Sequence, residues 1–161
     1  MFNLKAESYL KIIFLFSFIS LISAFFIEHV LGHQPCNLCL IERIPYGLSI
    51  MIIIAIFLIK KNQKFLILLL ILTFIFSLAI SFYHFGIEQG FFQESSVCGV
   101  NSLTGSIIKE DLLKQLSEKT ISCKDVTFRI FGLSLTSINI VISLLFTITL
   151  LKIFKEYEKN K

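Results

Sequence analysis

The chain has 161 residues, of which 55% are hydrophobic and 16% are charged, and its formal net charge is +4. A soluble domain has about 25% charged residues, so this composition excludes an ordinary water-soluble protein. The lysines stand beside long apolar runs, so the positive charge indicates orientation in a membrane rather than nucleic-acid binding.

Four apolar runs are long enough to cross a bilayer as helices. About 20 residues span the ~30 Å hydrocarbon layer, and a backbone in lipid must satisfy its polar groups within its own helix. The sequence therefore predicts an all-α membrane protein, a four-helix transmembrane bundle forming a single integral membrane domain over residues 1–161. The predicted spans cover about residues 9–29, 40–59, 65–85 and 131–153, and a polar loop covers 86–130.

The first run has an alternative interpretation as a secretory signal peptide. Lys5 and Lys11 lie at its start, and Ile22-Ser23-Ala24 resembles a cleavage site. The apolar region of a signal peptide has about 7–15 residues, which is shorter than this run. The length favours a helix that stays in the membrane.

Two cysteines, Cys36 and Cys39, stand just before the second run in the segment CNLC. A Cys-x-x-Cys brings two sulfurs close enough for a disulfide and often lowers the pKa of one thiol, which is typical of redox sites. The same motif is half of a zinc site, for which Cys98 and Cys123 would supply the other ligands. The motif alone favours redox chemistry over metal binding without excluding the metal.

Glu42 and Arg43 follow this motif at the membrane edge. Charged side chains there often simply extend to water. Alternatively, Arg43 lies one helical turn after Cys39, where a guanidinium favours a thiolate and donates hydrogen bonds to a carbonyl oxygen at the membrane surface. Pro45 leaves the helix start open, because it suits the first turn of a helix beginning near Arg43 and would kink one beginning at Cys39.

Lysines gather on one side of the predicted membrane topology. They occupy the 60–64 link, the C-terminal tail and the N-terminal segment, whereas the 86–130 loop is nearly neutral. The positive-inside rule therefore predicts that both termini are cytoplasmic and that the loop and all four cysteines are periplasmic. That compartment is oxidising in bacteria, so disulfides persist there.

The long loop carries the second cysteine pair, Cys98 and Cys123, with 24 residues between them. Residues 107–116 show helical periodicity and are predicted to form a short amphipathic helix on the bilayer surface. Taken alone, the pair indicates a stapling disulfide. Beside a Cys-x-x-Cys on the same side of the membrane, thiol–disulfide exchange is the better interpretation. His84, at the end of the third run, is either an interfacial anchor or hydrogen-bonded packing residue, or a polar partner for a ligand at headgroup depth.

Nearly the whole chain resembles the disulfide bond formation protein B (DsbB) family of membrane thiol–quinone oxidoreductases. The motifs that carry the resemblance are, in chain order, CNLC at 36–39, ERIPY at 42–46, YHFGIE at 83–88, Cys98, Cys123, FGLS at 131–134 and Asn139.

The resemblance implies a protein of the bacterial inner membrane that uses ubiquinone or menaquinone and reoxidises a periplasmic thioredoxin-fold partner of the DsbA kind. It implies that Cys98 takes the mixed disulfide as the accessible loop cysteine, with Cys123 as its loop mate. Cys36 would receive the exchange, and Cys39 would be the thiolate at the quinone. Arg43 and His84 are the candidate quinone-binding residues, and no metal is expected.

Three alternatives remain open at this point. The four cysteines could hold a structural zinc, or the chain could be a structural membrane protein stapled by two disulfides. A vitamin K epoxide reductase-like enzyme is also a four-helix thiol–quinone protein, but its Cys-x-x-Cys lies late in the chain, whereas here it opens the second span.

Overall fold

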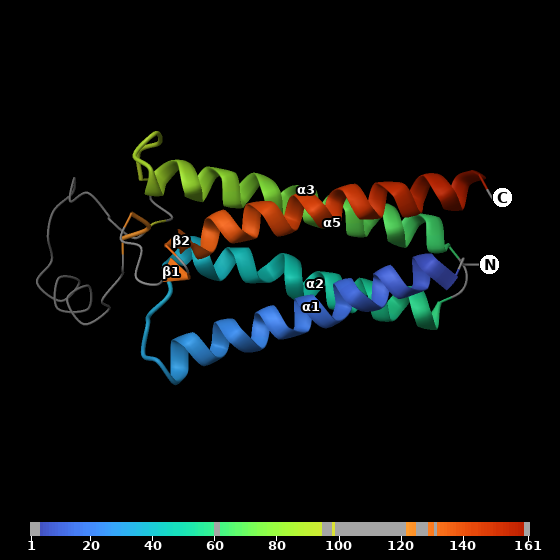
Figure 1. Ribbon diagram of the computed structural model, residues 1–161, viewed down its shortest axis with the longest axis horizontal. Coiled ribbons are helices and arrows are strands. Elements are labelled where there is room, and N and C mark those ends of the chain that lie inside the picture. Colours follow the sequence, from blue (N-terminus) through green and yellow to red (C-terminus); the bar gives the residue numbers. More distant parts are fainter. Residues whose placement is uncertain are drawn as a thin grey trace, which may run out of the picture.

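The computed structural model describes residues 4–59, 62–94, 98, 122–124, 129–130 and 132–159. Its main elements are four long helices, α1 (Leu4–His29), α2 (Asn37–Leu58), α3 (Gln63–Glu88) and α5 (Leu135–Lys159). The helices run alternately up and down, so both chain ends lie at one end of the bundle and the α1–α2 and α3–α5 connections lie at the other (Figure 1).

Each of the four helices is long and apolar enough to cross a membrane. Large apolar side chains cover the outside of the bundle, and Phe18, Met51, Phe76 and Leu151 are among those exposed. In water such a surface would be unfavourable, whereas in a bilayer it contacts lipid tails. The predicted all-α, four-helix membrane bundle is confirmed, and the chain is a multi-pass membrane protein.

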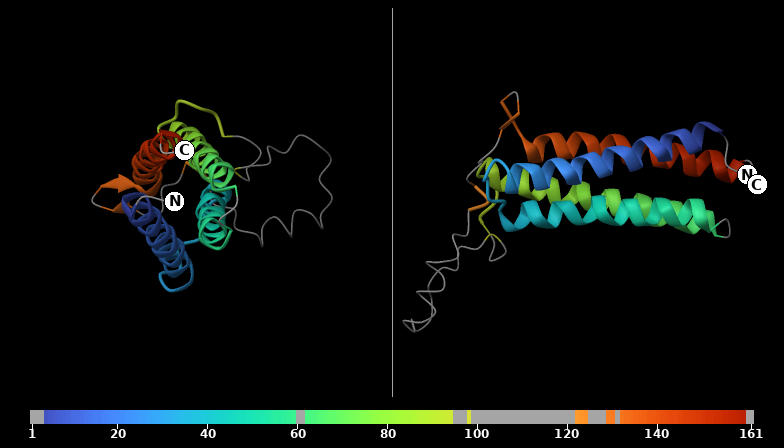
Figure 2. Two further views of the ribbon diagram at one scale, coloured as in Figure 1. Left: turned by 90° about the vertical axis from the view of Figure 1, so that its right-hand side faces the viewer. Right: turned by 90° about the horizontal axis from the view of Figure 1, so that it is seen from below.

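The helices surround a common axis, as the end-on view in Figure 2 shows. Helix α3 packs most extensively against α5 and α2, while α1 packs mainly against α2. The apolar core lies in the half of the bundle nearer the chain ends. Its most buried members are Leu10, Ile13, Ile53, Ile56, Ile67, Leu70, Phe74 and Leu150.

Small hydroxyl side chains join the helices within the membrane. The hydroxyl of Ser49 on α2 donates to Ser17 on α1 at 3.0 Å, and Ser77 on α3 lies 3.0 Å from Ser143 on α5. All four serines are fully buried. Small polar residues allow close helix approach and supply interhelical hydrogen bonds, so they fix the rotation of each helix about its own axis.

The ends of the helices differ from the predicted spans at the cysteine-bearing end. The long loop does not begin at residue 86, because α3 continues to Glu88. The fourth span begins at Leu135 rather than at 131, since a short antiparallel ribbon of β1 (Arg129–Ile130) and β2 (Leu133–Ser134) precedes it. Gly132, with φ +82°, supplies the left-handed residue between these strands. The predicted amphipathic helix at 107–116 lies outside the described residues.

The chain folds back tightly after α3. The backbone N–H groups of Phe91 and Phe92 both donate to the carbonyl of Gly86, at 2.8 and 3.1 Å. The Phe92 ring lies against Gly86 and stacks on Tyr83, with ring centroids 5.7 Å apart. A Cβ on Gly86 would lie 2.1 Å from the Phe92 ring, so this close approach requires glycine.

Candidate functional site: a thiol pair beside a buried histidine

Cys36 and Cys39 lie at the first turn of α2. Cys36 is the N-cap, and its Sγ accepts a hydrogen bond from the backbone N–H of Cys39 at 3.3 Å. The two sulfurs are 2.7 Å apart, within about 0.7 Å of disulfide bonding distance. Cys36 is buried and Cys39 is half-buried. A helix N-terminus favours a negative charge, so the position suits a thiolate.

The pKa of the Cys36 thiol is lowered to about 5 by its surroundings. The largest cause is the hydrogen bond from the Cys39 side chain, which stabilises the thiolate. Burial acts in the opposite direction, and the hydrogen bond and charge of His84 lower the pKa further. The surroundings of Cys36 therefore favour its thiolate form.

His84 lies inside the bundle and not at the lipid surface, since its side chain is only 2% exposed. Its Nε2 is 3.6 Å from Cys36 Sγ, and its Nδ1 is 3.0 Å from Glu42 Oε1. The structure thus brings together the predicted site residues Cys36, Cys39 and His84. Both of its ring nitrogens face polar partners, so His84 is a buried, hydrogen-bonded residue rather than an interfacial anchor, and a role in ligand binding stays a prediction.

A buried polar network surrounds this histidine. The Asn139 amide donates from Nδ2 to Glu42 Oε2 at 3.1 Å and to Ser81 Oγ at 2.7 Å. Its Oδ1 accepts a hydrogen bond from the Tyr46 hydroxyl. The network links α2, α3 and α5, and Asn139 bonds across helices.

Two further residues face the same histidine and were not predicted. Thr136 Oγ1 lies 3.3 Å from His84 Nδ1 and donates to Glu88 Oε1 at 2.6 Å. Glu88 Oε1 lies 3.9 Å from His84 Nε2. One sequence signal was available for Glu88, because it follows His84 by one helical turn.

Cys98 and Cys123 form a disulfide with a Cα–Cα distance of 5.5 Å. The disulfide packs beside Cys36 in a small apolar cluster whose other main members are Leu38 and Ile87. Cys98 is 1% exposed and Cys123 is 2% exposed, so the expectation of an accessible loop cysteine is wrong for this conformation. The sequence placed Cys98 in a polar loop, but the apolar surroundings of Ile87 and Leu38 bury it.

Glu94 fixes the segment that carries Cys123. Its Oε1 accepts hydrogen bonds from the Ser122 hydroxyl and, at 3.0 Å, from the backbone N–H of Lys124. These contacts join the end of the chain reversal after α3 to the residues flanking the second cysteine of the loop. They help hold the disulfide against the end of the bundle.

Arg43 points toward α1. Its Nη1 forms an ion pair with Glu28, and its guanidinium lies 5.5 Å from the centroid of the Phe25 ring. Helix α2 begins at Asn37 and includes Pro45, so Cys39 and Arg43 belong to one continuous helix, one turn apart. This settles the helix start that Pro45 left open. The side chain is mostly buried at the α1–α2 contact rather than extended into water.

The four-cysteine zinc alternative does not fit this arrangement. Zinc binds thiolates, and the Cys98–Cys123 disulfide offers none. The donor atoms of Cys36, Cys39 and His84 lie within 4.8 Å of one another, but two of them are the near-bonded sulfurs of the thiol pair. The geometry favours redox chemistry.

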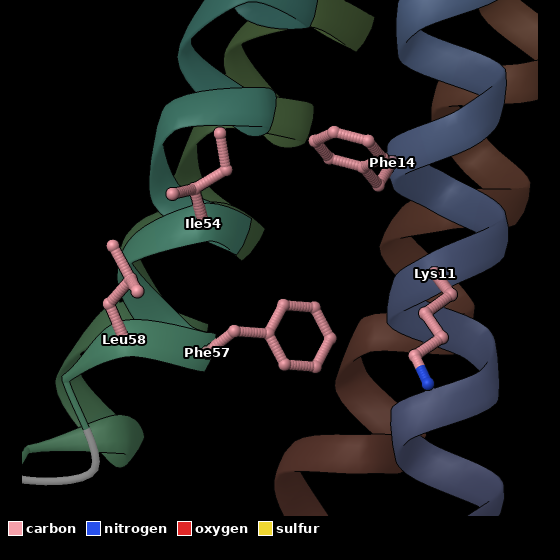
Figure 3. Close-up of a pocket in the computed structure, with 5 residues that line it drawn as sticks. All are labelled: Lys11, Phe14, Ile54, Phe57 and Leu58. Carbon is pink, nitrogen blue, oxygen red and sulfur yellow. The ribbon is translucent and has the colours of Figure 1, made fainter.

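A separate apolar pocket lies between α1 and α2 near the opposite end of the bundle. It is lined by Lys11, Phe14, Ile54, Phe57 and Leu58 (Figure 3). Its walls are hydrocarbon apart from the Lys11 ammonium. It contains no cysteine or histidine and plays no part in the thiol site.

Comparison with known proteins agrees with this geometry. The chain is 29% identical over 147 residues to the uncharacterized protein RP370 of Rickettsia prowazekii (strain Madrid E), an alignment that covers 90% of this chain and 86% of that protein. Residues 6–153 match the family described as disulfide bond formation protein DsbB. This match includes α2 and α3, most of α1 and α5, both cysteine pairs, Arg43 and His84. The chain therefore belongs to the DsbB family of membrane proteins that form disulfide bonds.

Proposed function

We propose that this protein is a protein-dithiol:quinone oxidoreductase. It reoxidises a periplasmic thioredoxin-fold protein of the DsbA kind and passes the electrons to ubiquinone or menaquinone, which supports disulfide bond formation in exported proteins. The observation that carries the proposal is that Cys36 and the Cys98–Cys123 disulfide belong to one buried cluster at one end of a membrane bundle. Two redox pairs in one cluster suit a relay for electron pairs.

The proposed order of the relay is the one that the resemblance to the DsbB family implies. A partner thiolate attacks Cys98 Sγ, the Cys98–Cys123 bond breaks, and Cys123 leaves as a thiolate. The Cys123 thiolate then attacks Cys36 Sγ of an oxidised Cys36–Cys39 pair, a Cys123–Cys36 bond forms, and Cys39 leaves as a thiolate. Each step exchanges one S–S bond for another, so the electron pair moves from the loop pair to Cys39. Cys39 is the less buried of its pair.

The residues around Arg43 fit a quinone head at the membrane edge. Arg43 offers a planar set of N–H donors beside an aromatic ring, and Leu40 and Ile44 on the same helix are exposed to lipid. When bound, a quinone accepts two electrons and two protons. Arg43 would donate a hydrogen bond to a carbonyl oxygen of the head, while Glu28 holds the guanidinium in place. The assignment of His84 to the quinone stays a prediction.

A quinone is needed on energetic grounds. The potential of DsbA is about −120 mV and that of thioredoxin about −270 mV, so a pair of ordinary thioredoxin-like potential would face a step of roughly 7 kcal/mol uphill. A terminal acceptor must draw the electrons forward, and a lipid-soluble quinone reaches a site at the membrane edge directly.

The orientation of the protein follows from its lysines. The end of the bundle that holds the chain termini also holds the Lys-rich α2–α3 connection (Figure 1). The positive-inside rule places this end in the cytoplasm of the bacterial inner membrane. The cysteine-bearing end then faces the periplasm, where a soluble partner can meet it.

The test is to mix the purified protein with a fully reduced DsbA and a water-soluble quinone, and to follow quinone absorbance and partner thiols together. We expect one quinone reduced for each partner disulfide formed. A Cys39→Ala variant is the control and should stop quinone reduction. A structural protein stapled by disulfides would produce no thiol exchange, and that result would reject the proposal.

A further inference from the structure

Glu42 is a buried carboxylate to which the relay described above gives no task. It is 9% exposed, and each of its oxygens has one partner, His84 Nδ1 and Asn139 Nδ2 respectively. A buried carboxylate is costly unless it is paired and hydrogen-bonded. Glu42 meets this condition through its two partners, one of which is the histidine beside Cys36.

The two nitrogens of His84 have different partners. Nδ1 faces Glu42 Oε1 at 3.0 Å, with Thr136 Oγ1 at 3.3 Å, and Nε2 faces Cys36 Sγ at 3.6 Å. In a histidine, the hydrogen bond at one nitrogen decides which nitrogen carries the proton in the neutral ring. A carboxylate at Nδ1 keeps the proton there and leaves the Nε2 lone pair directed at the thiol.

This order of groups, a thiol next to a base that a third residue orients, is the general arrangement that activates a nucleophile. The ring is 2% exposed, so water does not compete for either nitrogen. Three other groups surround the pair. Glu88 lies 3.9 Å from Nε2 without a hydrogen bond to it, Asn139 binds the far oxygen of Glu42, and Cys39 contacts Cys36. Arg43, the nearest cation in the sequence, is paired with Glu28 instead.

We propose that Glu42 is a positioning residue that holds the His84 imidazole toward Cys36, so that His84 accepts the Cys36 proton whenever the thiol pair is reduced. The S–H bond of Cys36 breaks, an N–H bond forms at His84 Nε2, and no electron moves in this step. The carboxylate of Glu42 stabilises the imidazolium that results. Only the use of this proton rests on the proposed function. There, it becomes one of the two protons that a dithiol releases as a quinone is reduced.

The test measures the thiolate of Cys36 without partner or quinone. In a Cys39→Ser background with the Cys98–Cys123 disulfide intact, the alkylation rate of Cys36 by iodoacetamide is measured by mass spectrometry from pH 4.5 to 9. We expect Glu42→Gln to shift this profile about one pH unit upward, which reduces the rate about eightfold at pH 4.5 but only about twofold at pH 6. Glu42→Asp keeps the charge on a shorter side chain and should fall between the two.

Glu88→Gln is the matched control, because it removes an equal charge near His84 without touching a hydrogen bond to the ring. It should shift the profile much less than Glu42→Gln does. Equal shifts in the two variants would overturn the proposal in favour of a general effect of negative charge. A Glu42→Gln profile that coincides with its parent would also overturn it.

Each variant must be folded before its alkylation profile can be compared with the parent. Circular dichroism in detergent confirms that each variant is folded, and Glu42→Asp carries the test if Glu42→Gln does not fold. A Glu42→Asp profile identical to the parent would then count against positioning by this side chain. Alkylation requires no quinone, so failure of the quinone assay would reject the proposed function and leave this result intact.

Discussion

The hydroxyl of Tyr46 on α2 donates a hydrogen bond to Oδ1 of Asn139 on α5, deep inside the bundle. The same amide donates to Glu42 and to Ser81, so one side chain connects three helices. The amide therefore couples the packing of the bundle to the carboxylate that faces His84.

Replacing this amide should destabilise the protein. Asn139→Leu removes one acceptor and two donors from buried partners, and interhelical hydrogen bonds in membranes contribute about 0.6–1.7 kcal/mol. We expect a loss of roughly 1–2 kcal/mol in the free energy of unfolding, measured in mixed detergent micelles. Thr149→Val is the control, since that exposed hydroxyl bonds only to Leu145 O of its own helix. Equal stability of Asn139→Leu and the parent would contradict the role given to the network.

Arg43 should determine quinone affinity. Losing a charged hydrogen bond costs roughly 1.5–3 kcal/mol, so Arg43→Ala should raise the KM for quinone about tenfold or more. Arg43→Lys keeps the charge but loses the planar fork, and we expect an intermediate value. Glu28→Gln should raise KM by less, because it frees the guanidinium without removing it. Unchanged quinone kinetics in a folded Arg43→Ala protein would leave Arg43 as a residue that only joins α1 to α2.

Loss of Cys98 and loss of Cys39 should block different steps of the relay. Cys98→Ala should abolish the mixed disulfide with the soluble partner, because the electrophilic sulfur is gone. Cys39→Ala should still capture the partner but deliver no electrons to quinone. Non-reducing gels show the mixed disulfide, and quinone absorbance shows the delivery. Normal turnover by Cys98→Ala would show that the relay order is wrong.

The orientation can be tested by labelling intact cells with an impermeant thiol reagent. In a background without native cysteines, Asn101→Cys should react and Gln63→Cys should not. Gln63 is preferable to Asn62, because Asn62 has φ +65°, a left-handed conformation that cysteine disfavours. Labelling at Gln63 from outside would place the lysine-rich end in the periplasm and reject the redox assignment.

Hydropathy alone predicted the four helices, because a lipid environment allows few other structures for runs of this length. The shared location of the cysteines also followed from the sequence, since alternating helices return Cys36 and Cys98 to the same end. Whether the His84 side chain faces lipid or the core could not be predicted from the sequence. A residue at a helix end faces lipid or the core according to the rotation of α3, which depends on serine contacts such as Ser77–Ser143.

Glu42 was similarly ambiguous before its neighbours were known. A charged residue at the start of a span usually reaches water, and nothing local to α2 indicated otherwise. Its partners come from α3 and α5, at His84 and Asn139, which are 42 and 97 residues away in the chain. Such contacts arise from the packing of the bundle and have no signal within one helix. The boundary at Glu88 was missed for a related reason, because a short polar extension of an apolar helix resembles the start of a loop.

The burial of the Cys98–Cys123 disulfide has a kinetic consequence. A thiolate must approach a sulfur along the S–S axis, and the 1% and 2% exposures of these residues leave no such path. Attack on Cys98 therefore requires its sulfur to become more exposed than it is in this structure, and a partner that binds there can favour the exposed state through its contacts. A small free thiol has no such contacts and cannot easily reach the buried disulfide. Burial would thus slow reduction of the Cys98–Cys123 disulfide by small thiols.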